Sequence, residues 1–200
     1  MLVAVTGGIG SGKSIVARLL GELLSAPVFV SDEICRQLLD KDQEGYVAFV
    51  NLFGDRFLTD SREIDRALLR VAVFKDNEVR DQVEAILHPL VRLKFHQVRR
   101  DSSDGTIQIA EVPLLFECGW EKDFDHIICV ITDRETAVKR VVERDKVSRA
   151  EVERIMEIQM DTEAKARRSD WLIDNSNDLV DTRKQVEALI ELLRVLAGSG

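Results

Sequence analysis

The chain has 200 residues, of which 45% are hydrophobic and 32% are charged, a composition typical of a globular protein. Its formal net charge of −8 disfavours nucleic acid and anionic membranes as partners. No apolar run approaches the roughly 20 residues of a membrane span, and the amino-terminal run lacks the features of a signal peptide. Three scattered cysteines predict neither disulfides nor a zinc site, so we expect a cytoplasmic protein.

Apolar periodicity predicts strands alternating with helices. Buried strands are expected at 2–6, 27–30, 106–110, 126–131 and 171–173. Helices are expected at 15–20, 33–39, 44–53, 65–74, 77–100, 132–144, 148–160 and 178–197. Within 77–100 we expect a break or kink near His88, because a following proline disfavours helical backbone. Residues 101–105 are expected to form a loop, 161–169 a charged segment and 198–200 a flexible tail.

One sequence motif, at residues 7–14, names a ligand directly. It reads Gly-Gly-Ile-Gly-Ser-Gly-Lys-Ser and matches the P-loop pattern G-x-x-x-x-G-K-[ST], with a predicted strand before it and a helix after it. Glycines let backbone N–H groups converge on phosphate, and the helix start adds positive charge. Lys13 is predicted to reach the β and γ phosphates, and Ser14 to bind Mg²⁺. The nucleotide-binding residues predicted here are Gly8, Ile9, Gly10, Ser11, Gly12, Lys13, Ser14 and Ile15.

The order of the elements predicts an α/β fold, a five-stranded mostly parallel sheet in a P-loop three-layer sandwich. We expect one kinase domain, with its core at 1–34, 104–139 and 170–200. A helical lobe at 35–103 and a lid at 140–169 are expected as insertions. Ligands of such sheets bind beyond the carboxyl ends of the strands, which includes Glu111, Leu114 and Asn175.

Two carboxylates lie at predicted strand ends. Asp32 follows the second strand and is the candidate base for a hydroxyl acceptor, although the same residue type also caps helices. Glu111 ends the third strand, where P-loop proteins often carry the acid that supports Mg²⁺, and it is a candidate second metal residue. An incidental strand-end acid remains the alternative for Glu111.

The segment 134–168 holds ten basic and eight acidic residues, a net of +2 in an acidic chain. Arg140 and Arg144 are four residues apart and share one helix face, so they could clamp phosphate oxygens. A mobile lid that closes over ATP is one interpretation, and a solvated helix of alternating charge is the other.

Several short segments resemble one kinase family when they are taken in order. They are Thr6–Ser14, Asp32 with Arg36, Leu87-His88-Pro89, 112–117, Lys139-Arg140 with Arg144-Asp145, Gln159-Met160, Lys165 and 173–176. This ordered set resembles the dephospho-CoA kinases over about residues 2–177. The P-loop alone would fit many kinases, but the whole set at these intervals is specific.

The resemblance implies ATP-dependent phosphorylation of the ribose 3′-hydroxyl of dephospho-CoA, the last step of coenzyme A synthesis. It implies that Asp32 is the base, that Lys13 and Arg140 assist catalysis and that Arg144 contacts the nucleotide from the lid. Acceptor-binding residues implied in the same way are Asp32, Arg36, Arg66, His88 and Leu114. Asn175 follows the last predicted strand and could face the nucleotide base, although polar residues are also common at strand ends. We expect only small-molecule partners, dephospho-CoA and ATP, and a monomer or weak homo-oligomer.

The chain departs from the family pattern at three places. Ile15 stands where the family usually has Thr, which removes one hydroxyl contact but keeps the backbone N–H. Val30-Ser31-Asp32 replaces the common Asp-Ala-Asp and leaves Asp32 as the one acid there. Asn177 replaces a common glycine.

Three other functions are alternatives to this interpretation. A nucleoside or nucleoside-monophosphate kinase would share the core and lid but use another acceptor. A GTP-dependent switch is disfavoured because no Asn-Lys-x-Asp motif is present. A nucleic-acid ATPase conflicts with the acidic charge.

Overall fold

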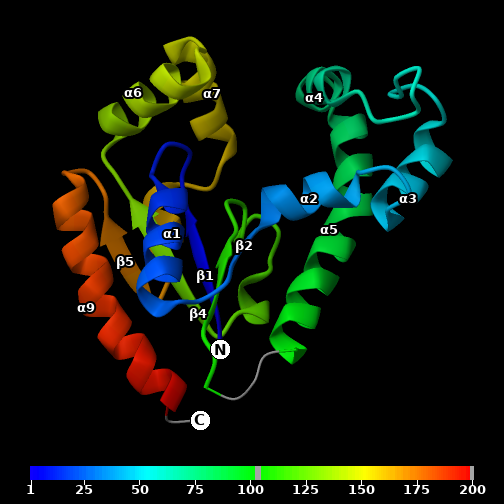
Figure 1. Cartoon of the computed structure of the whole chain (residues 1–200). Helices are drawn as coiled ribbons and strands as arrows, with labels where there is room; N and C mark the ends of the chain where they lie inside the picture. The colour runs from blue at the N-terminus through cyan, green and yellow to red at the C-terminus, as the bar shows by residue number, and fades with distance from the viewer. Residues whose placement is uncertain (102–104, 199–200) are drawn as a thin grey trace. The chain divides into compact units, whose positions relative to one another are not determined.

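The computed structural model describes residues 1–101 and 105–198 and divides the chain into two compact units (Figure 1). The first unit comprises Met1–Val30 and Arg99–Gly200, and the second comprises Ser31–Val98. The middle of the loop expected at 101–105 and the end of the tail expected at 198–200 lie outside the described residues.

Among the described residues, the first unit holds a five-stranded sheet in the order β2-β3-β1-β4-β5, with every neighbouring pair parallel. Its strands are β1 (Leu2–Gly7), β2 (Val28–Val30), β3 (Gln108–Glu111), β4 (His126–Ile131) and β5 (Trp171–Asp174). The central strand β1 is buried along its whole length, as a parallel strand covered on both faces should be. In the register of the sheet, Glu111 pairs with both Val5 and Val30, at the carboxyl ends of their strands. The α/β fold class predicted from the sequence is confirmed.

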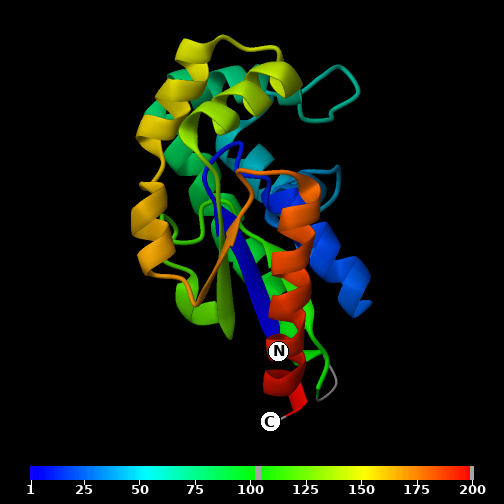
Figure 2. The ribbon, with the colours of Figure 1, turned by 90° about the vertical axis from the view of Figure 1, so that its left-hand side faces the viewer.

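Helices cover both faces of this sheet (Figure 2). Helices α1 (Lys13–Leu24) and α9 (Leu179–Gly198) pack together on one face, and α8 (Thr162–Arg167) packs against β1 and β4 on the other. Apolar side chains recur every three or four residues along α1 and α9, so each helix buries one stripe. Val16 and Leu20 of α1 and Val186 and Leu193 of α9 are fully buried in this core.

The segment 134–169, which contains the predicted lid and is called the lid region below, has its own small core. Helices α6 (Arg134–Asp145) and α7 (Arg149–Ile158) bury Val138, Val141 and Val152 between them. A short helix η1 (Glu121–Asp123) precedes β4. The sequence did not predict α8, which was expected to be part of a charged segment. Asp161 begins it by accepting a hydrogen bond from the Ala164 N–H, and such caps form in charged segments without an apolar stripe.

The second unit is mainly helical. It contains α2 (Ser31–Leu38), α3 (Glu44–Phe53), α4 (Arg66–Lys75) and most of α5 (Asn77–Arg100). Phe49, Phe53 and Phe57 pack in one aromatic cluster, with ring centroids 4.7–5.9 Å apart. None of the described helices, in either unit, is long and apolar enough to cross a membrane.

Of the break or kink expected near His88, the break is wrong, because α5 runs without interruption through Pro89. An interior proline costs a helix about 3 kcal/mol. Five apolar side chains spaced four residues apart, on both sides of the proline, are buried: Val79, Val83, Leu87, Val91 and Phe95. Burial of such a side chain contributes roughly 1.5–3 kcal/mol, so the row together outweighs the proline.

Candidate active site

The loop between β1 and α1 has the backbone shape of a phosphate cradle. Gly10 and Gly12 have φ of 76° and 89°, in the left-handed region that glycine adopts without strain. A Cβ on Gly10 would lie 2.5 Å from the Ala137 carbonyl oxygen. A Cβ on Gly12 would lie 2.0 Å from Nδ2 of Asn175. Both positions therefore require glycine for conformation and for space.

Lys13 and Ser14 begin α1 and hold polar contacts inside the loop. The Lys13 ammonium donates to the Gly8 carbonyl oxygen at 2.9 Å, and Lys13 is 9% exposed. The Ser14 hydroxyl donates to Oε1 of Glu111 at 2.8 Å. Glu111 is buried at 6% exposure, and the sheet register places it beside β1. A hydroxyl and a carboxylate this close are the hard oxygen ligands that Mg²⁺ takes in proteins, so the residues present fit the metal.

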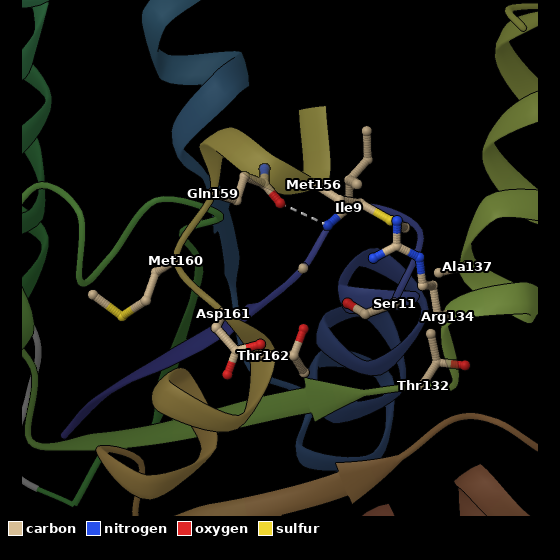
Figure 3. Close-up of a pocket in the computed structure, with 11 residues that line it drawn as sticks. Ile9, Ser11, Thr132, Arg134, Ala137, Met156, Gln159, Met160, Asp161 and Thr162 are labelled. Atoms are coloured by element: carbon tan, nitrogen blue, oxygen red, sulfur yellow. Dashed lines mark hydrogen bonds between the residues drawn. The ribbon is translucent and has the colours of Figure 1, made fainter. Parts of the chain in front are cut away.

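A pocket of about 260 Å³ lies between the P-loop and the lid region of the first unit (Figure 3). Its lining is Gly8, Ile9, Ser11, Thr132, Arg134, Ala137, Met156, Gln159, Met160, Asp161 and Thr162. Ser11 is 2% exposed, and its hydroxyl has no hydrogen-bond partner among the residues the structure describes. A buried hydroxyl of this kind is costly unless a ligand completes its hydrogen bonding.

Asn175, predicted to contact the nucleotide, lies against the P-loop backbone. Its Nδ2 donates to the Ser11 carbonyl oxygen at 2.8 Å, and its Oδ1 accepts from the Thr182 hydroxyl at 2.8 Å. Asn175 is 2% exposed and Thr182 is fully buried. Asn175 directly follows β5, and its side chain thus joins the P-loop to Thr182 of α9.

The two predicted lid arginines lie on α6 in different surroundings. Nη1 of Arg140 is buried and has no hydrogen-bond partner within the described part of the chain. Arg144 forms two hydrogen bonds with Asp145, at 2.7 and 2.8 Å, and this pairing raises the pKa of the guanidinium. Arg140 is partly buried and has one buried guanidinium nitrogen without a hydrogen-bond partner among the described residues, whereas Arg144 is held by the Asp145 carboxylate.

The sequence assigned no role to two further side chains, one that contacts the P-loop and one that anchors the segment following α7. Oε1 of Gln159 accepts a hydrogen bond from the Ile9 N–H of the P-loop at 2.9 Å. Lys165, fully buried, pairs with Glu117 at 2.8 Å and donates to the Pro113 carbonyl oxygen at 2.9 Å. Both belong to the motifs of the resemblance, but each acts over more than 40 positions in the chain, which no local pattern reveals.

The second unit carries four of the predicted site residues: Asp32, Arg36, Arg66 and His88. Asp32 lies in the first turn of α2, exposed, and its carboxylate makes no hydrogen bond with the residues that the structure describes. It therefore does not cap α2. Nη2 of Arg66 donates to the Arg36 carbonyl oxygen at 3.0 Å and to Asp40 at 2.7 Å. His88 lies half-buried on α5. Leu114, in the first unit, is 38% exposed.

Comparison with known proteins assigns the family. The family model described as dephospho-CoA kinase matches residues 1–181. The chain belongs to the dephospho-CoA kinase family. The family predicted from the ordered motifs is thereby confirmed, and this match over most of the chain favours none of the alternatives.

Individual members support the same assignment. The dephospho-CoA kinase of Fusobacterium nucleatum is 34% identical over 193 residues, covering 96% of this chain and 98% of that protein. The one from Shewanella oneidensis is 35% identical over 199 residues, covering 99% and 96%. Both alignments run over nearly the whole of each chain, so the similarity includes the lid and the second unit.

Solved structures agree with the fold. TT1252 from Thermus thermophilus matches with a TM-score of 0.79 at 32% identity, covering 96% of this chain and 97% of that one. The dephospho-CoA kinase from Campylobacter jejuni matches with a TM-score of 0.71 at 26% identity, covering 97% of each chain. Shikimate kinase from Bacteroides thetaiotaomicron, at 14% identity and a TM-score of 0.55, shares the fold alone.

Proposed function

We propose that this chain transfers the γ-phosphoryl group of ATP to the ribose 3′-hydroxyl of dephospho-CoA, giving coenzyme A and ADP. The choice of acceptor is supported by membership of the dephospho-CoA kinase family. Phosphoryl transfer is supported by one observation above the others. Lys13 is hydrogen-bonded to the P-loop carbonyl of Gly8, and the next residue, Ser14, is hydrogen-bonded to Glu111 at the carboxyl end of β3, where a P-loop enzyme holds its polyphosphate.

On the donor side, the P-loop N–H groups and the Lys13 ammonium bind the phosphate oxygens. Ser14 and Glu111 would hold Mg²⁺, which neutralises charge on the β and γ phosphates when bound. The buried Ser11 hydroxyl supplies a further donor within the same pocket. Arg140 and Arg144 stabilise charge on the transferring group from the lid.

On the acceptor side, the oxygen of the 3′-hydroxyl attacks the γ-phosphorus. As it does so, the Asp32 carboxylate accepts the hydroxyl proton. The bond from that phosphorus to the β–γ bridging oxygen breaks, and ADP leaves with the bonding pair. The absence of a capping hydrogen bond at Asp32, in the described part of the chain, favours this role. Arg36, Arg66, His88 and Leu114 hold the acceptor.

Mass spectrometry with Mg-ATP and a panel of acceptors tests the proposal. We expect dephospho-CoA to gain one phosphoryl group and nucleoside monophosphates to remain unchanged. Phosphorylation of a nucleoside monophosphate alone would mean that the acceptor is misassigned.

Replacement of the base tests its role separately. We expect Asp32→Asn to lower kcat at least ~100-fold, the usual contribution of general base catalysis, while ATP still binds. Glu33→Gln, which changes the neighbouring exposed acid of the same helical turn, is the matched control and should keep its turnover. Normal turnover of Asp32→Asn would remove Asp32 from the mechanism.

A further inference from the structure

The peptide group between Gly8 and Ile9 is hydrogen-bonded at both ends. Its carbonyl oxygen accepts from the Lys13 ammonium at 2.9 Å and from the Ser11 N–H at 3.3 Å. Its N–H donates to Oε1 of Gln159 at 2.9 Å, the dashed line of Figure 3. Because a peptide group is planar, holding its N–H also sets the direction of its carbonyl oxygen. Gln159 therefore acts on the same rigid group that binds Lys13.

Gln159 is itself anchored at the end of α7. The next residue, Met160, donates its N–H to Oε1 of Glu117 at 3.0 Å. The same carboxylate oxygen pairs with the buried Lys165 ammonium at 2.8 Å. Lys165 also binds the Pro113 carbonyl oxygen, so the segment around Gln159 is fixed to the turn that follows β3. The hydrogen-bond acceptor of Gln159 therefore belongs to a segment whose backbone is held in place by Glu117 and the buried Lys165.

The same part of the P-loop also packs against the lid region. The Ile9 side chain packs on the small core of α6 and α7, formed by Val138, Val141 and Val152. Oγ1 of Thr162 lies 3.3 Å from the position a Cβ on Gly8 would take. Gly8 itself allows wide backbone rotation, so nothing intrinsic to it holds the peptide in one orientation. The orientation depends on hydrogen bonds, and the one to the N–H comes from Gln159.

We propose that Gln159 is a positioning residue of the phosphoryl-transfer site, which keeps the Gly8 carbonyl directed at Lys13 and so holds the lysine ready for the triphosphate. This inference rests on the proposed function in one respect, namely that the P-loop binds ATP. It assigns to the lid region a task in the donor site that does not depend on closure over the substrate.

The test compares Gln159→Leu, which fills similar space without an acceptor, with Gln159→Glu, which keeps an acceptor and adds a negative charge. Glu157→Gln, an exposed change on the same helix, is the control. Amide hydrogen exchange of Ile9, read by NMR, reports the hydrogen bond. ATP dissociation constants from calorimetry report the donor site without any acceptor present, so they remain informative even if dephospho-CoA is not the acceptor.

In Gln159→Leu we expect Ile9 exchange to accelerate and ATP to bind about tenfold more weakly, as for a hydrogen-bonding group left unsatisfied. Gln159→Glu should keep Ile9 protected. Any loss of ATP affinity in that variant should shrink as salt is added, because it comes from charge, whereas the loss in Gln159→Leu should persist. Glu157→Gln should match the wild type in both measurements.

A double-mutant cycle separates positioning of Lys13 from a general structural effect. In a Lys13→Ala background we expect Gln159→Leu to change ATP affinity by less than about twofold, because the group it positions is gone. Equal effects in both backgrounds would refute action through Lys13. Unchanged Ile9 exchange in Gln159→Leu would refute the hydrogen bond itself. Unchanged ATP binding despite faster exchange would refute positioning, and tighter ATP binding would show that Gln159 competes with phosphate.

Discussion

Lys165 carries the most buried charge described in the molecule, and its replacement tests how the lid region is attached. The side chain is 0% exposed, and its ammonium has two acceptors, Glu117 and the Pro113 carbonyl oxygen. Lys165→Met keeps the length and apolar stem but leaves both acceptors without their donor. Breaking a buried ion pair from one side costs about 3–5 kcal/mol.

The Glu117 side chain is 21% exposed and keeps its hydrogen bond from the Met160 N–H, so the low end of that range applies. A loss of about 3 kcal/mol corresponds to a melting temperature about 6–12 °C lower in a chain of this length. Differential scanning calorimetry of the wild type and the variant measures this shift directly.

Two further variants make the measurement decisive. Lys165→Met combined with Glu117→Gln removes both charges but keeps an acceptor for the Met160 N–H, so it should recover at least about half of the loss. Lys184→Met is the matched control, because the Lys184 side chain is 70% exposed and its ammonium lies 3.7 Å from Oδ1 of Asp181. Exposed ion pairs contribute little, so the melting temperature of this variant should differ from that of the wild type by less than about 2 °C. If Lys165→Met is no less stable than Lys184→Met, or if the double variant melts with the single one, the ion pair does not carry the stability assigned to it.

Three other outcomes follow from the geometry. Arg140→Ala should lower kcat about 100-fold or more yet shift the melting temperature by less than about 2 °C, because Nη1 has no hydrogen-bond partner among the described residues to lose. The control Lys139→Ala should change neither kcat nor the melting temperature. Normal turnover of Arg140→Ala would favour a purely solvated helix. Asn175→Ala should weaken ATP binding about tenfold in calorimetry, because the Ser11 carbonyl oxygen loses its buried donor, and an unchanged affinity would mean that the loop holds its shape alone. Burial raises the pKa of the Cys129 thiol to about 11, so at pH 8 only about one thiol in a thousand is ionised. Alkylation followed by peptide mass spectrometry should therefore find that Cys129 reacts at least ~100-fold more slowly than the partly exposed Cys35. Alkylation of Cys129 should accelerate as the pH rises towards 11, and equal rates for the two cysteines at pH 8 would contradict the burial.

The roles that could be predicted from the sequence belong to residues whose chemistry depends on their neighbours along the chain. The P-loop spans eight consecutive positions, so its glycines and Lys13 are recognisable without any tertiary contact. The strands were predicted in number and type because each is a short apolar run, and their burial in a covered parallel sheet follows from that composition.

Local reasoning failed where packing between distant segments decided the outcome. Pro89 should have interrupted α5, but the buried row on both of its sides holds the helix together. Asn175 was expected to face the nucleotide because it follows a strand, but the sequence did not indicate that its amide also donates to the Ser11 carbonyl oxygen, 164 residues earlier in the chain. The nucleotide contact proposed for Asn175 stays a prediction until its variant is measured.

What the sequence by itself determined is the phosphate cradle, the α/β class and, through motifs in a fixed order, the kinase family, because each depends on residue type and spacing along the chain. What only the tertiary structure decided is how the cradle is supported. Ser14 meets Glu111 across 97 positions, and Ile9 meets Gln159 across 150. Such hydrogen bonds require two segments to be folded against each other at a separation of about 3 Å, and no pattern within either segment contains that distance.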